Sequence, residues 1–329
     1  MLKRLRIDPY LIALAATVGL AALLPARGTG AVITEIVTNA AIFLLFFLYG
    51  ARLAPQAVLT GFAHWRLQGA ILLTTFVVFP ILGMGLQALI GGHLPAPLVT
   101  GLVFTCLLPS TVQSSIAFTS IARGNVPAAL CAASASNLAG VILTPLLVGL
   151  VLHTQGGFNL KAFEDIALQL LLPFGLGQAA RPLIGAFLGR HKVLTSYVDR
   201  GSILFVVYGA FSAGVVAGIW HQVDLAGLAS VIGLDVALLA IVLVATTLAS
   251  RAIGFNKADE IATVFCGSKK SMASGIPMAN ILFPAQSVGL VVLPLMLFHQ
   301  IQLFACAFLA QRYGARAEVT EATLAKAVS

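Results

Sequence analysis

The sequence predicts an all-α membrane protein of ten transmembrane helices arranged in two inverted five-helix repeats. Three observations predict this fold class. Of the 329 residues, 59% are hydrophobic and 9% are charged, and the mean hydropathy is +1.01, a composition foreign to soluble domains of this size. Apolar segments that can each cross about 30 Å of hydrocarbon recur along almost the whole chain. The basic residues and an internal repeat both fit ten crossings.

The ten expected spans follow one another with short connecting loops. They are residues 9–25, 31–51, 68–91, 98–122, 127–153, 160–180, 201–220, 225–250, 261–283 and 287–311. No loop is long enough for an extramembrane domain, so we expect one polytopic membrane domain over residues 1–329. Residues 315–329 are expected to form a small polar tail in the cytoplasm.

The distribution of Lys and Arg orients the chain, because cytoplasmic loops are enriched in both. With the N-terminus inside, ten spans put 15 of the 19 basic residues on the cytoplasmic side, and only Arg27 and Lys161 on the other. The other two, Lys269 and Lys270, lie inside a span. Both termini are therefore expected in the cytoplasm and the protein in the inner membrane. Topology explains the net charge of +8 without a nucleic-acid partner.

A shift of 157 positions relates the two halves of the chain. It places Asp8 on Asp165, Pro25 on Pro182, Ser114 on Ser271 and Pro127 on Pro284. The repeats cover about residues 8–153 and 160–312. Because each holds an odd number of spans, the second copy enters the membrane from the opposite side, as in many secondary transporters. The repeat also gives residues 9–25 a partner, which argues against a cleaved signal peptide.

Small polar residues interrupt the fourth and the ninth span, where apolar turns are expected. In the fourth span they are Pro109, Ser110, Thr111, Gln113, Ser114 and Ser115, and in the ninth they are Cys266, Gly267, Ser268, Lys269, Lys270 and Ser271. Unwound backbone inside a membrane must line a cavity or be buried in protein, and a freed helix N-terminus favours anions. The two runs therefore predict an ion or solute site, with packing between small residues as the alternative.

Lys269 and Lys270 lie where the interior of the bilayer is expected. Lys269 is nine residues from Glu260 at the cytoplasmic edge, a depth of about 14 Å and close to the midplane. A lysine stem reaches only about 6 Å, so each ammonium group needs water, a ligand or a carboxylate. If the span instead began near Met272, both lysines would lie at the membrane surface.

Asp235 is a candidate for that carboxylate, since it falls inside the eighth span about ten residues from its external end. A buried acid there can pair with a lysine or carry a proton. In the competing interpretation the span covers residues 236–255, and Asp235 is an ordinary exposed residue at its end.

Two further groups of polar residues lie in the spans. They are His299 with Gln300 and Gln302 in the tenth span, and Ser134, Ser136 and Asn137 in the fifth. The histidine can relay protons near neutral pH or form a packed hydrogen bond. The fifth-span residues can bind a cation or solute, or bond to a neighbouring helix.

Cofactor and nucleotide chemistry have no support in the sequence. Cys106, Cys131, Cys266 and Cys306 all lie in spans and form no metal-binding pattern, and nucleotide-binding and metalloprotease motifs are absent. We expect no cofactor and no enzyme activity, so transport must run on an ion gradient, on exchange or downhill. The alternatives are an intramembrane hydrolase with Ser268 or Ser271 as nucleophile and a lysine base, and a non-transporting regulator of ion homeostasis.

Two motifs carry a resemblance to a known family. The run ARGNV at residues 122–126, after a broken fourth span in an inverted repeat, resembles the bile acid:sodium symporter family. The run FCGSKKS at residues 265–271, with GIP at 275–277, is more similar to its divergent branch, the solute carrier family 10 member-7-like proteins. The resemblance covers about residues 5–316. The first motif is moderately specific and the second strongly so.

The resemblance implies a panel of spans one, two, six and seven beside a core in which broken helices four and nine cross, with the solute next to the crossing. In sodium-coupled members, a ninth-span glutamate and a following Gln-Asn pair help to bind two sodium ions. Here Phe265 stands at the glutamate position, and Lys269 and Lys270 at the pair. In the fourth span Ser115 matches a ligand serine, but Ile116 replaces the ligand asparagine.

The resemblance therefore implies a degenerate sodium site near Ser115, Phe265 and Gly267. Two unit charges at about 4 Å repel each other by roughly 4 kcal/mol even at an effective dielectric of 20, so we do not expect sodium coupling in its familiar form. We predict that a lysine ammonium takes the place of a sodium ion, or that the lysine pair receives an organic anion. The expected function is secondary transport of such an anion or another small solute across the lipid bilayer.

Overall fold

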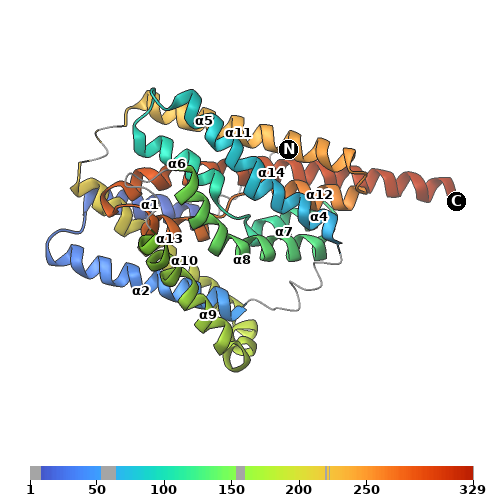
Figure 1. Ribbon diagram of the computed structural model, residues 1–329. Helices are drawn as coiled ribbons and strands as arrows, with labels where there is room; N and C mark the ends of the chain where they lie inside the picture. Colours follow the sequence, from blue (N-terminus) through green and yellow to red (C-terminus); the bar gives the residue numbers. More distant parts are fainter. Residues whose placement is uncertain (1–8, 53–63, 153–159, 219–220, 222, 329) are drawn as a thin grey trace. The chain divides into compact units, whose positions relative to one another are not determined.

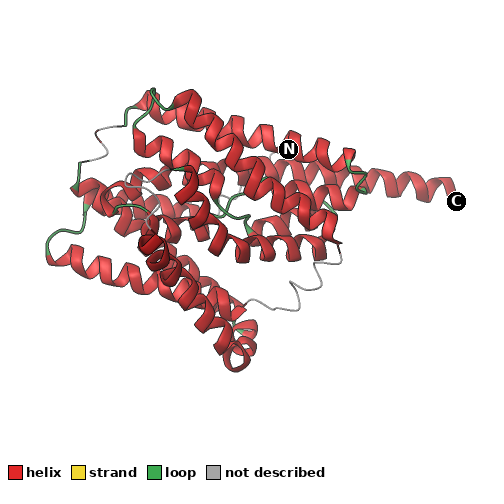
Figure 2. Ribbon diagram, in the orientation of Figure 1, coloured by secondary structure: helices red, strands yellow, loops and turns green. Residues whose placement is uncertain are grey.

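The computed structural model describes residues 9–52, 64–152, 160–218, 221 and 223–328. All regular elements in these ranges are helices, as Figure 2 shows. The chain forms two compact units, and each takes segments from both halves of the sequence. The all-α prediction is confirmed.

The first unit contains four of the helices labelled in Figure 1. They are α1 (Pro9–Leu23), α2 (Thr29–Arg52), α9 (Leu160–Arg190) and α10 (Lys192–Val216). Glycines bring α2 and α9 together: a Cβ added at Gly50 would overlap the carbonyl of Phe174. Small residues let membrane helices approach this closely. At the end of α2, the Arg52 guanidinium donates to both carboxylate oxygens of Asp199, at 2.5 and 2.8 Å, and ties α2 to α10.

The second unit holds most of the remaining elements. They are α4 (Trp65–Leu73), the π-helix η2 (Thr74–Val78), α5 (Phe79–Ile90), α6 (Ala96–Leu107), α7 (Val112–Ile121), α8 (Val126–Val151), α11 (Leu225–Ala252) and α12 (Lys257–Gly267). Two further helices, α13 (Met272–Leu282) and α14 (Ala285–Val328), contribute residues to both units.

Asparagine caps start two helices of the second unit. The Asn125 side chain accepts a hydrogen bond from the N–H of Ala128 at the start of α8, and Pro127 occupies the first turn, where no donor is lost. In the same way Asn256 accepts from the N–H of Asp259 at the start of α12. The acidic side chains of Asp259 and Glu260 in that first turn favour the positive end of the helix dipole.

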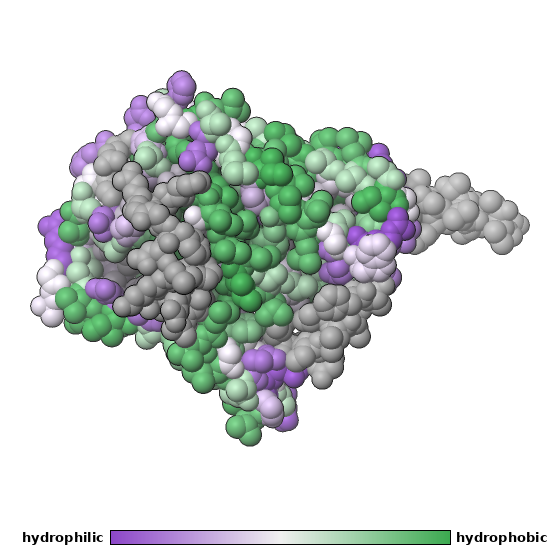
Figure 3. Space-filling model, viewed as in Figure 1, coloured by the Kyte–Doolittle hydropathy of each residue, from purple (hydrophilic) through white to green (hydrophobic). Residues whose placement is uncertain are grey.

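The described helices are those of a multi-pass membrane protein. Seven of them are long and apolar enough to cross a membrane, and eight if α6 and α7, bent by 60° at their break, form one span; α1 adds a shorter apolar helix. Large apolar side chains are exposed, with Leu23, Leu183 and Leu225 each more than 80% accessible. Hydrophobic residues cover much of the face seen in Figure 3. Contact of such a surface with lipid tails costs little free energy, whereas its exposure to water is unfavourable.

Several helices extend beyond the spans expected from hydropathy. Helix α10 begins at Lys192 and α12 at Lys257, ahead of the expected starts at residues 201 and 261. Helix α14 runs to Val328, so the expected tail continues a helix as far as that residue. Hydropathy marks the part of a helix that lies in hydrocarbon, whereas Ala, Glu, Lys and Arg prolong the helix itself into water.

The fourth and the ninth expected spans are both interrupted, over residues 108–111 and 268–271. The first residues after the breaks, Val112 and Met272, are 160 positions apart, so the offset of 157 is wrong at this point. Ser114 lies in the first turn of α7, whereas Ser271 lies in a break. The breaks are also shorter than the polar runs. Gln113, Ser114 and Ser115 lie in the first turn of α7, where serine and glutamine are well tolerated, and Cys266 and Gly267 lie in the last turn of α12.

Candidate functional site

The two breaks are hydrogen-bonded to each other. The N–H of Ser271 donates to the carbonyl of Pro109 at 2.9 Å, and the Thr111 hydroxyl donates to the carbonyl of Lys270 at 2.8 Å. Each bond satisfies a backbone group that has no helical partner. The structure therefore brings together the two polar runs that the sequence singled out.

Side chains of the fourth-span segment also cap the end of α12. The Ser110 hydroxyl donates to the carbonyl of Cys266 at 2.5 Å, and the Ser115 hydroxyl donates to the carbonyl of Phe265 at 3.1 Å. These are carbonyls of the last turn, which an α-helix leaves without donors. Ser115 and Phe265, both expected at a degenerate sodium site, are thus in direct contact.

Two fifth-span candidates, on α8, complete the backbone bonds of the first break. Ser136 accepts a hydrogen bond from the N–H of Ser110 at 3.0 Å, and the Asn137 amide donates to the carbonyl of the same residue at 2.6 Å. The other end of the Asn137 side chain accepts from Ser274 at 2.8 Å. In this conformation both side chains hydrogen-bond to other parts of the protein, which is the alternative to cation or solute binding that the sequence left open.

The tenth span contributes a glutamine to the second break. Gln302 on α14 accepts from the N–H of Lys270 at 2.9 Å and donates to the carbonyl of the same residue at 3.0 Å. Its amide nitrogen also lies 2.8 Å from Nδ1 of His299. His299 is therefore linked to the break through Gln302.

The Lys270 ammonium is enclosed by backbone carbonyls. The side chain is fully buried, and Nζ donates to the carbonyls of Thr75, Cys106 and Leu108 at 3.0, 2.9 and 2.7 Å. The same nitrogen lies 4.0 Å from the centre of the Phe79 ring. Three donors thus meet three acceptors, and an aromatic face adds a cation–π contact.

Local backbone geometry explains why the carbonyl of Thr75 is free to accept. In the π-helical turn the N–H of Phe79 bonds to Thr74, so it does not serve Thr75. The next residue, Pro80, has no N–H to donate. The π-turn and the proline together turn one carbonyl of a transmembrane helix into a cation ligand.

The other two carbonyls are free because α6 ends. Cys106 lies in the last turn of α6 and Leu108 lies in the break. The next available donor, the N–H of Ser110, bonds to Ser136 instead. All three acceptors of the Lys270 ammonium are therefore carbonyls that, in a regular continuous α-helix, would accept a hydrogen bond from the backbone N–H four residues later.

Lys269 is equally buried but has a different environment. Its Nζ lies 4.0 Å from the ring centre of Phe118 and 5.4 Å from that of Phe265. Over the described ranges it has no hydrogen-bond acceptor. Both lysines are fully buried within the protein. Only Lys269 has donors to spare.

The structure decides between the two interpretations of Asp235. Asp235 is fully buried inside α11, so the interpretation as an exposed end residue is wrong. Within the described chain its carboxylate oxygens bond to neither lysine.

The structure also bears on the hydrolase alternative. The Ser268 hydroxyl donates to the carbonyl of Val264, and the Lys270 amine donates to three backbone carbonyls. No serine–lysine pair of the kind that a hydrolase needs is formed there.

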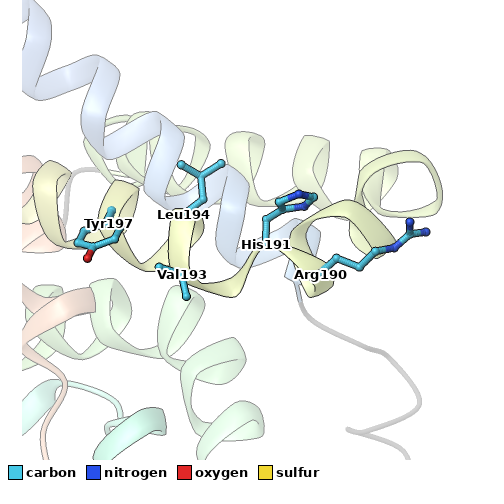
Figure 4. Close-up of a pocket in the computed structure, with 5 residues that line it drawn as sticks. All are labelled: Arg190, His191, Val193, Leu194 and Tyr197. Atoms are coloured by element: carbon cyan, nitrogen blue, oxygen red, sulfur yellow. The ribbon is translucent and has the colours of Figure 1, made fainter.

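The remaining candidates lie outside this network of bonds. Gln113 is exposed and Ser134 is half-buried, and none of the hydrogen bonds described above involves them. Ser114 has a buried hydroxyl without a partner in the described part of the chain. A separate pocket of the first unit is lined by Arg190, His191, Val193, Leu194 and Tyr197 at the turn between α9 and α10 (Figure 4). It contains none of the expected site residues.

Sequence reasoning named Gln302 as a polar neighbour of His299 but did not link it to the break. It missed the carbonyls of Thr75, Cys106 and Leu108, of which Thr75 had a weak signal in the nearby Pro80. The rings of Phe79 and Phe118 had none, since aromatic residues are common in apolar helices and only the fold shows which of them face a cation.

Arg251, Lys257 and Glu260 form a charged cluster at the start of α12. Buried Glu260 accepts from Lys257 at 2.6 Å and from Arg251 at 3.3 Å. Burial alone would raise the pKa of Glu260, but the hydrogen bonds from Lys257 and Arg251 outweigh it and hold this pKa below its ordinary value of 4.5. Burial and the nearby Glu260 carboxylate raise the pKa of Tyr313.

Comparison with known proteins identifies the family. The model of the SBF-like CPA transporter family matches residues 8–315. PA2026 of Pseudomonas aeruginosa, whose name assigns no activity, is 54% identical over 327 residues, which cover 98% of this chain and 97% of that protein. YfeH of Escherichia coli strain K12, named as a candidate symporter, is 51% identical over 317 residues and 96% of both chains.

A more distant relative bears out the resemblance seen in the sequence. Sodium/bile acid cotransporter 7 of Rattus norvegicus is 27% identical over 311 residues, which cover 92% of this chain and 91% of that protein. The matches extend over almost the whole length of every chain compared. This protein, a multi-pass membrane protein and not an enzyme, belongs to the SBF-like CPA transporter family.

Proposed function

We propose that this chain is a secondary transporter of an organic anion in which the Lys270 ammonium replaces a bound sodium ion. The observation that carries the proposal is the set of three backbone carbonyls at 2.7 to 3.0 Å from Nζ. Hard cations such as sodium prefer oxygen ligands of this kind. A cation fixed to the chain does the same electrostatic work without depending on the sodium concentration.

Lys269 is the group proposed to attract the anion. Its fully buried ammonium lies over the rings of Phe118 and Phe265 and has no hydrogen-bond partner within the described structure. A buried cation without hydrogen bonds is costly, and a carboxylate or sulfonate would offset that cost. In this proposal Lys270 is the fixed cation and Lys269 binds the solute, which are the two roles that the sequence left open.

The architecture proposed for this function has ten spans in inverted repeats, with a panel and a core. The first unit combines α1, α2, α9 and α10, which are the four spans of the implied panel. Both breaks belong to the other unit. Movement of one bundle relative to the other would give alternating access. Both termini are proposed to lie in the cytoplasm, with the protein in the inner membrane.

Uptake into proteoliposomes tests the proposal. The first probe is radiolabelled taurocholate, a bile-acid anion, because the names of distant relatives cite bile acids. We expect uptake at equal rates in sodium and in potassium buffers, and its loss in Lys269→Ala and Lys270→Ala. Lys257→Ala, which removes a lysine at the start of α12, is the matched control and should retain uptake. Strict dependence on sodium would refute the replacement of sodium by Lys270.

A further inference from the structure

Asp235 is a buried acid that the proposed solute site does not use. It lies ten residues into α11 and is fully buried. Both of its carboxylate oxygens are inaccessible and lack hydrogen-bond partners among the residues described. Buried carboxylates are normally hydrogen-bonded or ion-paired, so this residue calls for a functional explanation.

The surroundings of Asp235 disfavour its charged form. One to two turns further along α11, Leu238, Leu239 and Val242 pack against Phe79 and Phe298 in an apolar cluster. A carboxylate in such a medium loses its hydration without compensation, whereas a neutral carboxylic acid loses far less. The unpaired acid is therefore compatible with this conformation only when it holds a proton.

No neighbouring charge changes this conclusion within the described chain. Helices α6, α12 and α14 pack against α11. Their titratable groups at membrane depth include Cys106 on α6, Glu260 and Cys266 on α12, Lys269 and Lys270 after it, and His299 and Cys306 on α14; Lys269 has no hydrogen-bond partner among the described residues. The Cys106 thiol lies within electrostatic range of both Asp235 and Lys270, but the Lys270 ammonium is already bonded to three carbonyls. Glu260 is engaged by Arg251 and Lys257, and the His299 ring contacts Gln302.

We propose that Asp235 is the binding site of a coupling proton. The carboxylate takes a proton from hydronium when water reaches it, forming one O–H bond and releasing water, and returns it to water in another conformation. Proton uptake then favours the conformation in which Asp235 is buried, by linkage. This inference deepens the proposed function, because it assigns the driving ion of the same transporter to α11.

Infrared spectroscopy of the reconstituted protein tests proton binding without any solute. At about pH 7, where an exposed aspartate is ionised, the wild type should show the C=O stretching band of a buried carboxylic acid. Asp235→Asn should lose this band, and Asp235→Glu should keep it at a shifted frequency. Asp259→Asn, which removes a half-buried carboxylate at the start of α12, is the control and should leave the band unchanged. Identical spectra for the wild type and Asp235→Asn would overturn the proposal.

Proton-driven uptake separates this proposal from the proposed function. An inward proton gradient should accelerate taurocholate uptake by the wild type several-fold, whereas Asp235→Asn should retain exchange and lose the response. A gradient response that survives in Asp235→Asn would overturn the coupling role. If neither protein moves taurocholate, the proposed function fails for that anion, and the infrared band still decides whether Asp235 holds a proton.

Discussion

At the scale of residues, the two adjacent lysines differ because of the acceptors that each one meets. The Lys270 ammonium has three donors and three carbonyl partners, so its burial is compensated. Lys269 lies against aromatic faces and has no hydrogen-bond partner among the described residues, and a cation–π contact of about 2 kcal/mol does not replace hydration. In the proposed function Lys270 therefore serves as the fixed cation and Lys269 binds the solute.

The charged cluster at Glu260 predicts a dependence of stability on pH. Because the pKa of Glu260 is lowered in the folded state, its ion pairs stabilise the protein above about pH 4.5, and this contribution is lost as the pH falls through the lowered pKa. Since Lys257 and Arg251 are more than half exposed, the contribution should be about 1 kcal/mol.

Thermal unfolding of Glu260→Gln in detergent measures this contribution. The variant should unfold at a lower temperature than the wild type at neutral pH, and the difference should vanish in acid. Glu35→Gln removes an exposed carboxylate of α2 and should leave the profile unchanged. A difference that is constant across the pH range would contradict the assignment to ion pairing.

At the scale of elements, the two breaks are stabilised by exchange of hydrogen bonds. Helix ends leave donors and acceptors that lipid cannot satisfy. The Ser271 N–H of the second break donates to the Pro109 carbonyl of the first, and the Ser110 hydroxyl of the first break donates to the Cys266 carbonyl in the last turn of α12. Side chains of α8 and α14 supply further partners. A single break of this kind would leave unpaired groups, which explains why the two occur together.

Close packing of α8 against the first break makes a glycine essential there. A Cβ added at Gly140 would lie 2.6 Å from the Pro109 side chain, so Gly140→Ala should destabilise the protein by about 1 to 3 kcal/mol. Gly85→Ala on α5 is the control, because nothing lies within 4 Å of the added Cβ, and it should be neutral or stabilising by up to about 1 kcal/mol. Equal unfolding temperatures for both variants would show that the contact carries no energy.

The elements were largely predictable from the sequence, and the contacts between them were not. Pro109 and the lysine pair indicated both breaks because a proline or a charge in hydrocarbon contradicts the surrounding pattern. The carbonyl of Thr75 was beyond prediction, since its availability depends on the π-turn η2 and on the position of that turn relative to Lys270. The offset of 157 rested on matching residue types, which do not fix where a helix unwinds.

At the scale of the whole molecule, the sequence order and the spatial order differ. Each compact unit is assembled from distant segments, and the first unit takes residues from both halves of the chain. An arrangement of this kind follows naturally if two duplicated halves exchange equivalent helices. Composition predicted a polytopic membrane protein correctly, whereas the pairing of distant helices depends on side-chain fit that hydropathy does not record.

The predicted topology puts both ends of the chain on one side of the membrane. With ten spans and a basic N-terminus, green fluorescent protein fused after Ser329 should fluoresce in the bacterial cytoplasm, and alkaline phosphatase fused there should be inactive. A fusion after residue 27, in the first expected external loop, is the control and should give the reverse. Active phosphatase at the C-terminus would contradict an even number of spans.

Chemical rescue of Lys270→Ala tests most directly whether the lysine fills a cation site. Removal of the ammonium leaves three carbonyls without donors, so the variant should lose about 3 kcal/mol of stability. Sodium or methylammonium should raise its unfolding temperature but not that of the wild type. Lys269→Ala, which lacks a carbonyl cage, should not respond either. If neither cation stabilises Lys270→Ala, or if all three proteins respond equally, the carbonyls do not form a cation site.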